Sequence, residues 1–130
     1  GEPCLPSDLG GGNWMAPTVI SGLSPYSRCS TEEIFGPVVT LHRFETDDEA
    51  LEIANCTRYG LAGSVWTSDL ERGRRFSESI ETGMVWVNAW LHRDLRVPFG
   101  GVKDSGVGRE GGKWSLGFFS EAMNVCVKHN

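Results

Sequence analysis

Apolar stretches alternate with amphipathic stretches through the middle of the chain. Residues 38–44 begin with β-branched and apolar side chains, and residues 61–66 and 84–88 have the same character. Such short apolar runs predict strands. Between them, apolar side chains recur at helical spacing, as Ala50 and Leu51 do in the first interval. The pattern therefore predicts the order strand, helix, strand, helix, strand.

Each expected helix begins with residues that satisfy its first backbone N–H groups. Thr46 is followed three residues later by Glu49, and Ser68 by Glu71, and each pair forms a capping box. Because strands joined through helices cross over with one hand, the three strands should be parallel. We therefore predict an α/β fold with a parallel-sheet βαβαβ core.

The flanking segments have weaker patterns. Residues 14–20 favour a short strand, although Pro17 places it at a sheet edge or makes it irregular. Residues 113–120 have a helical pattern, and residues 124–128 that of a final strand. Ligands of parallel sheets bind beyond the carboxyl ends of the strands. The segment 89–99 leaves the third strand at that edge, and we expect chemistry there.

Composition and charge exclude several classes of function. Lys and Arg number 12 against 17 Asp and Glu, so no basic stripe is available for nucleic acid. No apolar run reaches the roughly 18–20 residues that span a bilayer. The four cysteines form no CxxC pair and the three histidines are scattered, so no metal site is expected. Without a secretory signal, the cysteines indicate reduced thiols in a cytoplasmic protein.

Two motifs have competing interpretations. Residues 106–111 match the GxGxxG dinucleotide fingerprint, but a long polar loop precedes them and no acid follows about 20 residues later, so we reject it. In residues 30–37, Ser30 and Glu33 fit a capped helical turn. Phe35, held by the rigid Gly-Pro that follows, fits equally well as an aromatic packed on a cofactor ring. The residues alone leave both readings of this segment open.

Several motifs in order resemble the aldehyde dehydrogenase superfamily. They are EEIFGP at 32–37, YGLA at 59–62, GMVWVN at 83–88, PFGGVK at 98–103 and SGVGRE at 105–110. The resemblance runs from about residue 14 to residue 128. It implies a loop or truncated end at 1–13, the C-terminal part of the catalytic domain at 14–120, and an oligomerisation strand at 121–130.

The resemblance also implies roles for single residues. Glu33 would hydrogen-bond the nicotinamide ribose, and Phe35 would pack beside the nicotinamide. Phe99 would line the substrate tunnel, and Asn88 would order the neighbouring loop. The implied cofactor is NAD, with NADP left open, and the implied assembly is a homo-oligomer, a dimer or tetramer.

A narrower resemblance concerns residues 88–95. They are similar to a loop of the 2-aminomuconic and 2-hydroxymuconic semialdehyde dehydrogenases, and the resemblance implies a place in kynurenine and tryptophan catabolism. There the residue matching Arg93 grips a substrate carboxylate, which suits a forked guanidinium. Trp90 would also contact the aldehyde substrate. The alternative is that Arg93 pairs with Asp94 or Glu110 on the surface.

The family's nucleophilic cysteine belongs to a GQxC-like segment upstream of EEIFGP. No such segment occurs in the 130 residues, and Cys29 lies too close to the motif to match it. We therefore assign no catalytic residue, and expect the segment to be inactive alone and to expose apolar surface. The alternatives are a truncated, non-catalytic homologue that serves as an association module, and a free-standing dinucleotide-binding domain.

Overall fold

The structure, a computed structural model, describes residues 12–129. Cys4 and most of the loop expected at 1–13 lie outside the described residues. The chain divides into two compact units, one reaching to Arg58 and the other starting at Tyr59. Within the described part, no helix is long and apolar enough to cross a membrane.

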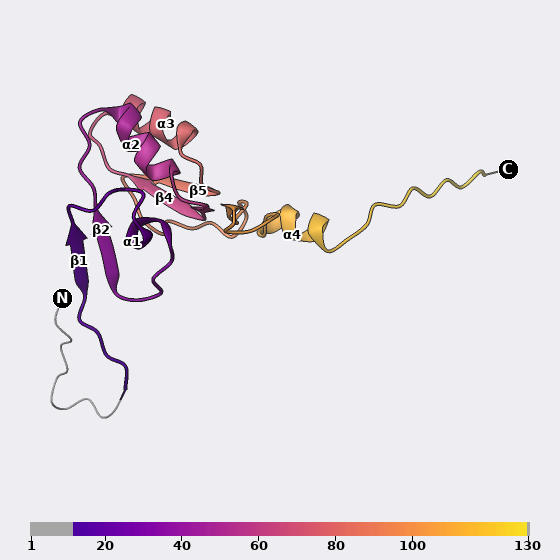
Figure 1. Ribbon diagram of the computed structural model, residues 1–130. Helices are drawn as coiled ribbons and strands as arrows, with labels where there is room; N and C mark the ends of the chain where they lie inside the picture. Colours follow the sequence, from indigo (N-terminus) through magenta and orange to yellow (C-terminus); the bar gives the residue numbers. More distant parts are fainter. Residues whose placement is uncertain (1–11, 130) are drawn as a thin grey trace. The chain divides into compact units, whose positions relative to one another are not determined.

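The first unit is a pair of parallel strands connected through a short helix. Strand β1 (Thr18–Ser21) lies beside β2 (Val38–Leu41), with α1 (Arg28–Thr31) between them in sequence and α2 (Asp47–Asn55) after them (Figure 1). The strand expected at 14–20 begins only at Thr18, directly after Pro17, and residues 14–17 are irregular. The Thr18 N–H donates to the carbonyl of Pro37, 2.8 Å away.

The capping box predicted for α2 is confirmed. The Thr46 hydroxyl accepts the Glu49 N–H at 3.2 Å. The Glu49 carboxylate in turn accepts the N–H of Glu45 at 2.7 Å, one residue before the cap. Both bonds satisfy N–H groups around the helix start, so the helix begins where the sequence predicts.

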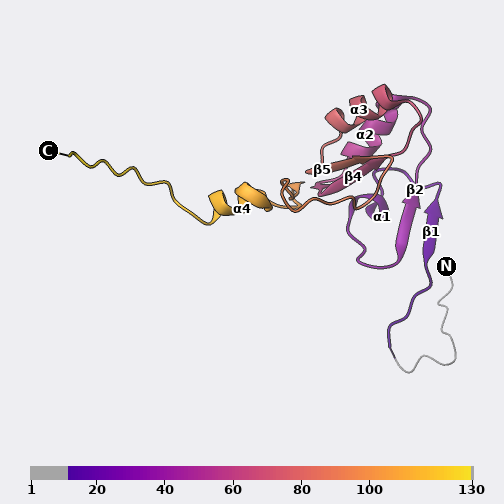
Figure 2. The same ribbon diagram turned by 180° about the vertical axis from the view of Figure 1, so that it is seen from behind.

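The second unit contains a parallel pair joined through a longer helix and a short antiparallel pair. Its elements are β3 (Tyr59–Gly60), β4 (Ala62–Val65), α3 (Leu70–Ser79), β5 (Met84–Val87), β6 (Val102–Lys103) and α4 (Gly112–Phe118). Strands β4 and β5 are parallel, and β3 and β6 are antiparallel. Helix α3 packs on the β4–β5 pair, as both views show (Figures 1 and 2). The approach is close at Gly73, where a Cβ would lie 2.8 Å from the Val87 side chain.

The α/β class with parallel strand pairs is confirmed, and one detail of the core differs. We expected the strands at 38–44, 61–66 and 84–88 to share one sheet. Instead β4 pairs with β5, and β2 pairs with β1 in a separate sheet. The segment that Pro17 made weakest in the sequence is thus the partner of β2.

Two predicted helix starts are wrong by one to three residues. The N-cap of α3 is Asp69 rather than Ser68, and its carboxylate accepts the Arg72 N–H at 3.0 Å. The N-cap of α1 is Ser27, and Ser30 lies inside the helix. The Ser30 hydroxyl lies 3.2 Å from His42 Nε2, so it serves contacts within the unit instead of capping Glu33.

The C-terminal segment forms no strand in the described residues. Residues 120–129 follow α4 as an extended stretch (Figure 1). The predicted strand at 124–128 thus has no partner strand within the described chain, and its role in oligomerisation stays a prediction.

Hydrophobic side chains are not enclosed anywhere in residues 12–129. The residues classed as buried there are the glycines Gly60, Gly73 and Gly101. Many large apolar side chains are exposed, among them Trp66, Leu116 and Phe119. Monomeric proteins rarely leave this much apolar surface open, so these faces have the character of an interface.

Candidate functional site

The segment 32–37 lies between α1 and β2, and its two adjacent glutamates have different surroundings. The Arg28 guanidinium donates two hydrogen bonds of 2.9 Å to the Glu32 carboxylate. These bonds hold the pKa of the Glu32 carboxyl below its usual value. Glu32 is therefore committed to a local pair, which leaves Glu33 as the carboxylate available to a ligand.

Glu33 and Phe35 line one open cavity of about 420 Å³. The remaining lining residues are Cys29, Glu32, Ile34, Gly36, Val38, Val39 and Thr40. The Phe35 ring is 91% exposed, and its backbone has a φ of 56°, a conformation that is costly for a bulky residue. The structure thus brings the predicted carboxylate and ring to one surface, where they can accept hydroxyl hydrogen bonds and contact a flat ring.

Asn88 closes the carboxyl ends of the β4–β5 pair. Its side chain accepts the Thr67 N–H at 2.8 Å and donates to the Thr67 carbonyl at 2.7 Å. Its own N–H donates to the Val65 carbonyl at 2.8 Å, and its φ is 52°, which asparagine tolerates better than most residues. These bonds fix the point from which the loop 89–98 departs.

The far end of the same loop is fixed by a backbone bridge. Phe99 and Glu110 exchange two N–H···O bonds, both 2.8 Å long. The Gly112 N–H also donates to the carbonyl of Leu95 at 3.1 Å. The loop 89–98 is therefore held at both ends and near its middle.

Arg93 projects from this loop onto Phe99. Its guanidinium carbon lies 4.2 Å from the centre of the Phe99 ring, which is cation–π geometry. A guanidinium nitrogen also lies 3.7 Å from the Glu110 carboxylate. Of the two surface partners considered for Arg93, the structure shows Glu110, because Asp94 accepts hydrogen bonds from Arg96 instead. Those bonds lower the pKa of Asp94.

Arg93 and Phe99 share a second cavity of about 410 Å³. Other residues that line it are Gly83, Met84, Val85, Trp86, His92, Asp94, Leu95, Val97, Pro98, Glu110 and Gly111. The cavity therefore combines apolar side chains with the Arg93 guanidinium and two carboxylates, of which Asp94 is paired with Arg96. The guanidinium suits a partly apolar molecule that carries a carboxylate.

Trp90 lies outside this lining and packs edge-on against Trp86, with ring centres 5.2 Å apart. Trp86 lines the cavity, and its indole N–H donates to the His92 carbonyl at 2.8 Å. Trp86 was not predicted as a cavity residue, because its place within an apolar strand made it resemble a core residue. A buried indole N–H needs a hydrogen-bond partner, and this requirement was the feature of the sequence that could have singled out Trp86.

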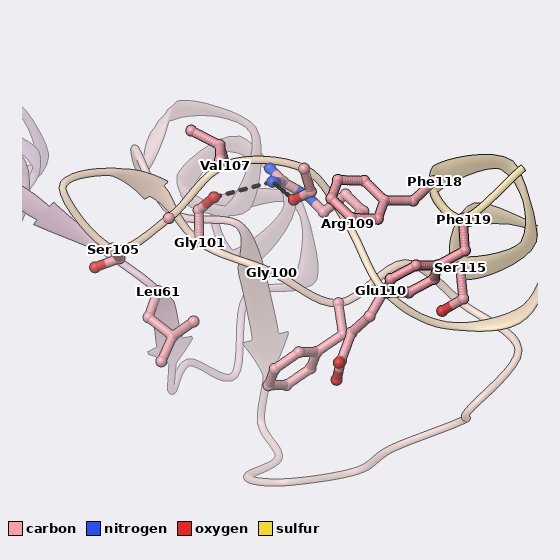
Figure 3. Close-up of a pocket in the computed structure, with 13 residues that line it drawn as sticks. Leu61, Gly100, Gly101, Ser105, Val107, Arg109, Glu110, Ser115, Phe118 and Phe119 are labelled. Atoms are coloured by element: carbon pink, nitrogen blue, oxygen red, sulfur yellow. Dashed lines mark hydrogen bonds between the residues drawn. The ribbon is translucent and has the colours of Figure 1, made fainter. Parts of the chain in front are cut away.

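A third cavity, of about 390 Å³, lies at the glycine-rich segment (Figure 3). There Arg109 donates to the carbonyls of Gly101 and Gly108, at 2.9 and 2.7 Å. The short strand β6 that precedes this segment is antiparallel to β3, so no βαβ unit surrounds the GxGxxG pattern. This arrangement supports rejecting the dinucleotide fingerprint.

The side chains that could ligate a metal, and the thiols, are scattered over the described residues. No group of three or more His, Cys, Asp or Glu side chains converges there. Cys29, Cys56 and Cys126 are free thiols. Cys29 borders the cavity of Glu33 and Phe35.

Comparison with known proteins gives a consistent result. The model of the aldehyde dehydrogenase family matches residues 1–125. The chain is 50% identical over 128 residues to a 2-hydroxymuconic semialdehyde dehydrogenase of Pseudomonas putida, covering 98% of this chain and 26% of that protein. It is 47% identical over 125 residues to the 2-aminomuconic semialdehyde dehydrogenase of Homo sapiens, covering 96% of this chain and 26% of that protein.

Solved structures agree with the sequence matches. An aldehyde dehydrogenase of Mycobacterium tuberculosis, complexed with NAD+, superposes with a TM-score of 0.84 at 41% identity, covering 90% of this chain and 24% of that one. The chain thus spans about a quarter of the length of the relatives that it matches. With a family match over nearly all of its residues, this chain belongs to the aldehyde dehydrogenase family.

Proposed function

We propose that this chain is the C-terminal part of an NAD-dependent aldehyde dehydrogenase that oxidises a carboxylate-bearing semialdehyde to the carboxylic acid. One observation carries the choice of substrate class. Arg93 lies over the Phe99 ring in a cavity that apolar side chains such as Leu95 help to line, on a loop that is fixed at both ends. A guanidinium in that position can take a carboxylate with two parallel hydrogen bonds.

The relatives support this class of substrate. Relatives that match the chain over nearly all of its length at 50% and 47% identity are named for action on 2-hydroxymuconic and 2-aminomuconic semialdehydes. Another such relative, at 44% identity, is named a benzaldehyde dehydrogenase, of Bacillus subtilis. Either semialdehyde has an aldehyde at one end and a carboxylate at the other, so one cation can orient it end to end. Action on 2-aminomuconic semialdehyde would put the enzyme in tryptophan catabolism.

The cavity of Glu33 and Phe35 fits one end of the cofactor. The Glu33 carboxylate can accept both hydroxyls of a ribose, and the exposed Phe35 ring can hold a flat base beside it. When bound, the dinucleotide supplies the acceptor of the substrate's hydride. NAD is proposed because a structural neighbour is complexed with NAD+.

The 130 residues alone should not turn over substrate. They contain no GQxC-like segment, and the exposed apolar faces call for a covering partner. An assay of this segment with NAD and an aldehyde checks the proposal, and any turnover would contradict it. A truncated homologue that only mediates association is the second candidate, favoured by those faces. A reading frame that encodes the GQxC segment upstream would remove that candidate.

The substrate assignment is tested by Arg93→Ala in the full-length protein, the longer chain that carries these residues. Loss of a charge-assisted pair should cost roughly 2–4 kcal/mol of transition-state stabilisation with 2-hydroxymuconic semialdehyde. This loss corresponds to a fall in kcat/KM of about thirtyfold to a thousandfold. Benzaldehyde, which has no carboxylate, should be nearly unaffected. Arg96→Ala is the matched control, because Arg96 is paired with Asp94. Equal losses for both aldehydes would remove the assignment.

The assembly and location follow from the same proposal. A homo-oligomer formed partly through residues 121–130 would cover exposed apolar side chains such as Met123 and Val125. The free thiols described above fit a reducing, cytoplasmic compartment. Removing residues 121–130 from the full-length protein should shift its mass in solution toward the monomer, as light scattering would show.

A further inference from the structure

Glu110 occupies a boundary between two cavities. Together with Phe99 it lines both the cavity of Arg93 and the glycine-rich cavity. The preceding residue, Arg109, turns toward the Gly101 carbonyl, while the Glu110 carboxylate points away from Arg109 (Figure 3). The Glu110 carboxylate lies 3.7 Å from the Arg93 guanidinium, whereas the other carboxylate that lines the cavity of Arg93, Asp94, is paired with Arg96.

Arg93 has two supports of different kinds. The contact with the Phe99 ring, at 4.2 Å, does not depend on any counter-ion. The contact with Glu110, at 3.7 Å, is beyond hydrogen-bond length, and the two side chains are 45% and 65% exposed. An exposed pair without hydrogen-bond geometry is weak. The ring therefore holds the guanidinium in place, and the carboxylate can leave at little cost.

Resting on the proposed function, we propose that Glu110 is a specificity-determining residue that acts as the resident counter-ion of Arg93. A substrate carboxylate displaces it and forms the closer, two-bonded pair that Glu110 does not form. Phe99 keeps the guanidinium positioned during the exchange. Because Glu110 partly neutralises Arg93 and repels a second carboxylate, it limits how strongly acidic aldehydes are preferred over neutral ones.

Glu110→Gln in the full-length protein tests this role. The substitution keeps the size of the side chain and the backbone bridge to Phe99, and it removes the charge. The ratio of kcat/KM for 2-hydroxymuconic semialdehyde to that for benzaldehyde should rise about two- to fivefold, the size expected from a weak pair. Glu45→Gln, which removes the charge of another exposed glutamate that lies outside this cavity, should leave the ratio unchanged.

Two further variants make the result decisive. Glu110→Asp, which draws the carboxylate back by one methylene, should raise the ratio by less than Glu110→Gln does. In an Arg93→Ala background, Glu110→Gln should no longer raise the ratio of kcat/KM for the acidic aldehyde to that for benzaldehyde. An unchanged or lower ratio in the Glu110→Gln enzyme, or a rise that persists without Arg93, overturns the counter-ion role.

The outcome for Glu110 is separable from the outcome for the substrate class. If Arg93→Ala alone depresses activity with the acidic aldehyde but Glu110→Gln leaves the ratio unchanged, only the inference about Glu110 fails. If Arg93→Ala affects both aldehydes equally, the proposed substrate class itself fails.

Discussion

Each unit of the molecule contains a strand–helix–strand arrangement, but the two present their functional residues in different ways. In the first unit, the four-residue helix α1 leads into the segment 32–37, and Phe35 is displayed by its own backbone conformation. In the second, the ten-residue helix α3 packs on β4 and β5, and the loop 89–98 is held at both ends. The proposed cofactor residues thus depend on local geometry, and the proposed substrate residues on contacts between distant segments.

This difference predicts how substitutions propagate. A change in the segment 32–37 should alter the contacts of one or two side chains and leave the fold intact. A change at the points that hold the loop 89–98 should disturb the fold and the position of Arg93 together.

Gly83→Ala should break the second unit. An added Cβ would collide with the carbonyl oxygen of Gly100, where two backbones touch directly. Neither backbone can yield without moving β5 or Phe99, so we expect a loss of roughly 3 kcal/mol or more in the free energy of unfolding. Chemical denaturation of the full-length protein and of the variant measures this difference in the free energy of unfolding.

Gly36→Ala is the control in the first unit. Its Cβ would lie 3.9 Å from the Ile34 side chain, an ordinary contact, so stability should change by no more than about 0.5 kcal/mol. If the Gly83→Ala and Gly36→Ala variants were equally stable, the proposed difference between the locally determined segment 32–37 and the anchored loop 89–98 would be wrong.

Glu33→Gln should weaken cofactor binding while leaving the fold unchanged. A carboxylate that accepts ribose hydroxyls contributes about 1.5–3 kcal/mol, so the Kd for NAD should rise roughly tenfold to a hundredfold. Glu32→Gln is the matched neighbour, and because Glu32 is paired with Arg28 it should change the Kd little. Fluorescence titration with NAD distinguishes the two. A larger effect at Glu32 would reverse the assignment.

The helix starts should be equivalent in the two units. Thr46 and Asp69 each accept one backbone N–H at the start of α2 and α3. Replacing either by alanine should cost about 1 kcal/mol of stability. Thr46→Ser, which keeps the hydroxyl, should cost less. Thermal unfolding of the variants measures the difference, and a loss above about 2 kcal/mol at only one site would show that the two helices support the fold unequally.

The sequence predicted those parts of the fold that local patterns specify. The helices at Asp47–Asn55 and Leu70–Ser79 and the strands beside them follow from apolar spacing and capping residues. Strand partners were harder, since pairing depends on distant segments, and β1 emerged as the partner of β2 despite Pro17. Ser68 and Asp69 are both good N-caps, so the pattern could not choose between them.

The candidate site divides in the same way. The motif that contains Glu33 and Phe35 is contiguous, so the sequence could nominate both residues, and the structure places them on one cavity. Arg93 and Phe99 were also predicted, and their roles stay predictions, whereas the residues that surround them come from separate segments. Trp86 was missed, and Glu110 appeared only as an alternative partner, because no local pattern links a strand, a loop and the glycine-rich segment.

The loop that carries Arg93 leaves from the Asn88–Thr67 bonds and returns at the Phe99–Glu110 bridge. Within the loop, the carbonyls of Ala89, His92 and Leu95 accept hydrogen bonds from residues outside it, so these anchors use the loop's backbone. The side chains of the loop can therefore vary in evolution while the residues that anchor it stay the same. The equivalent loop could be taken from an aldehyde dehydrogenase that prefers another aldehyde and placed between these anchors. The resulting chimera should then show the preference of the donor enzyme.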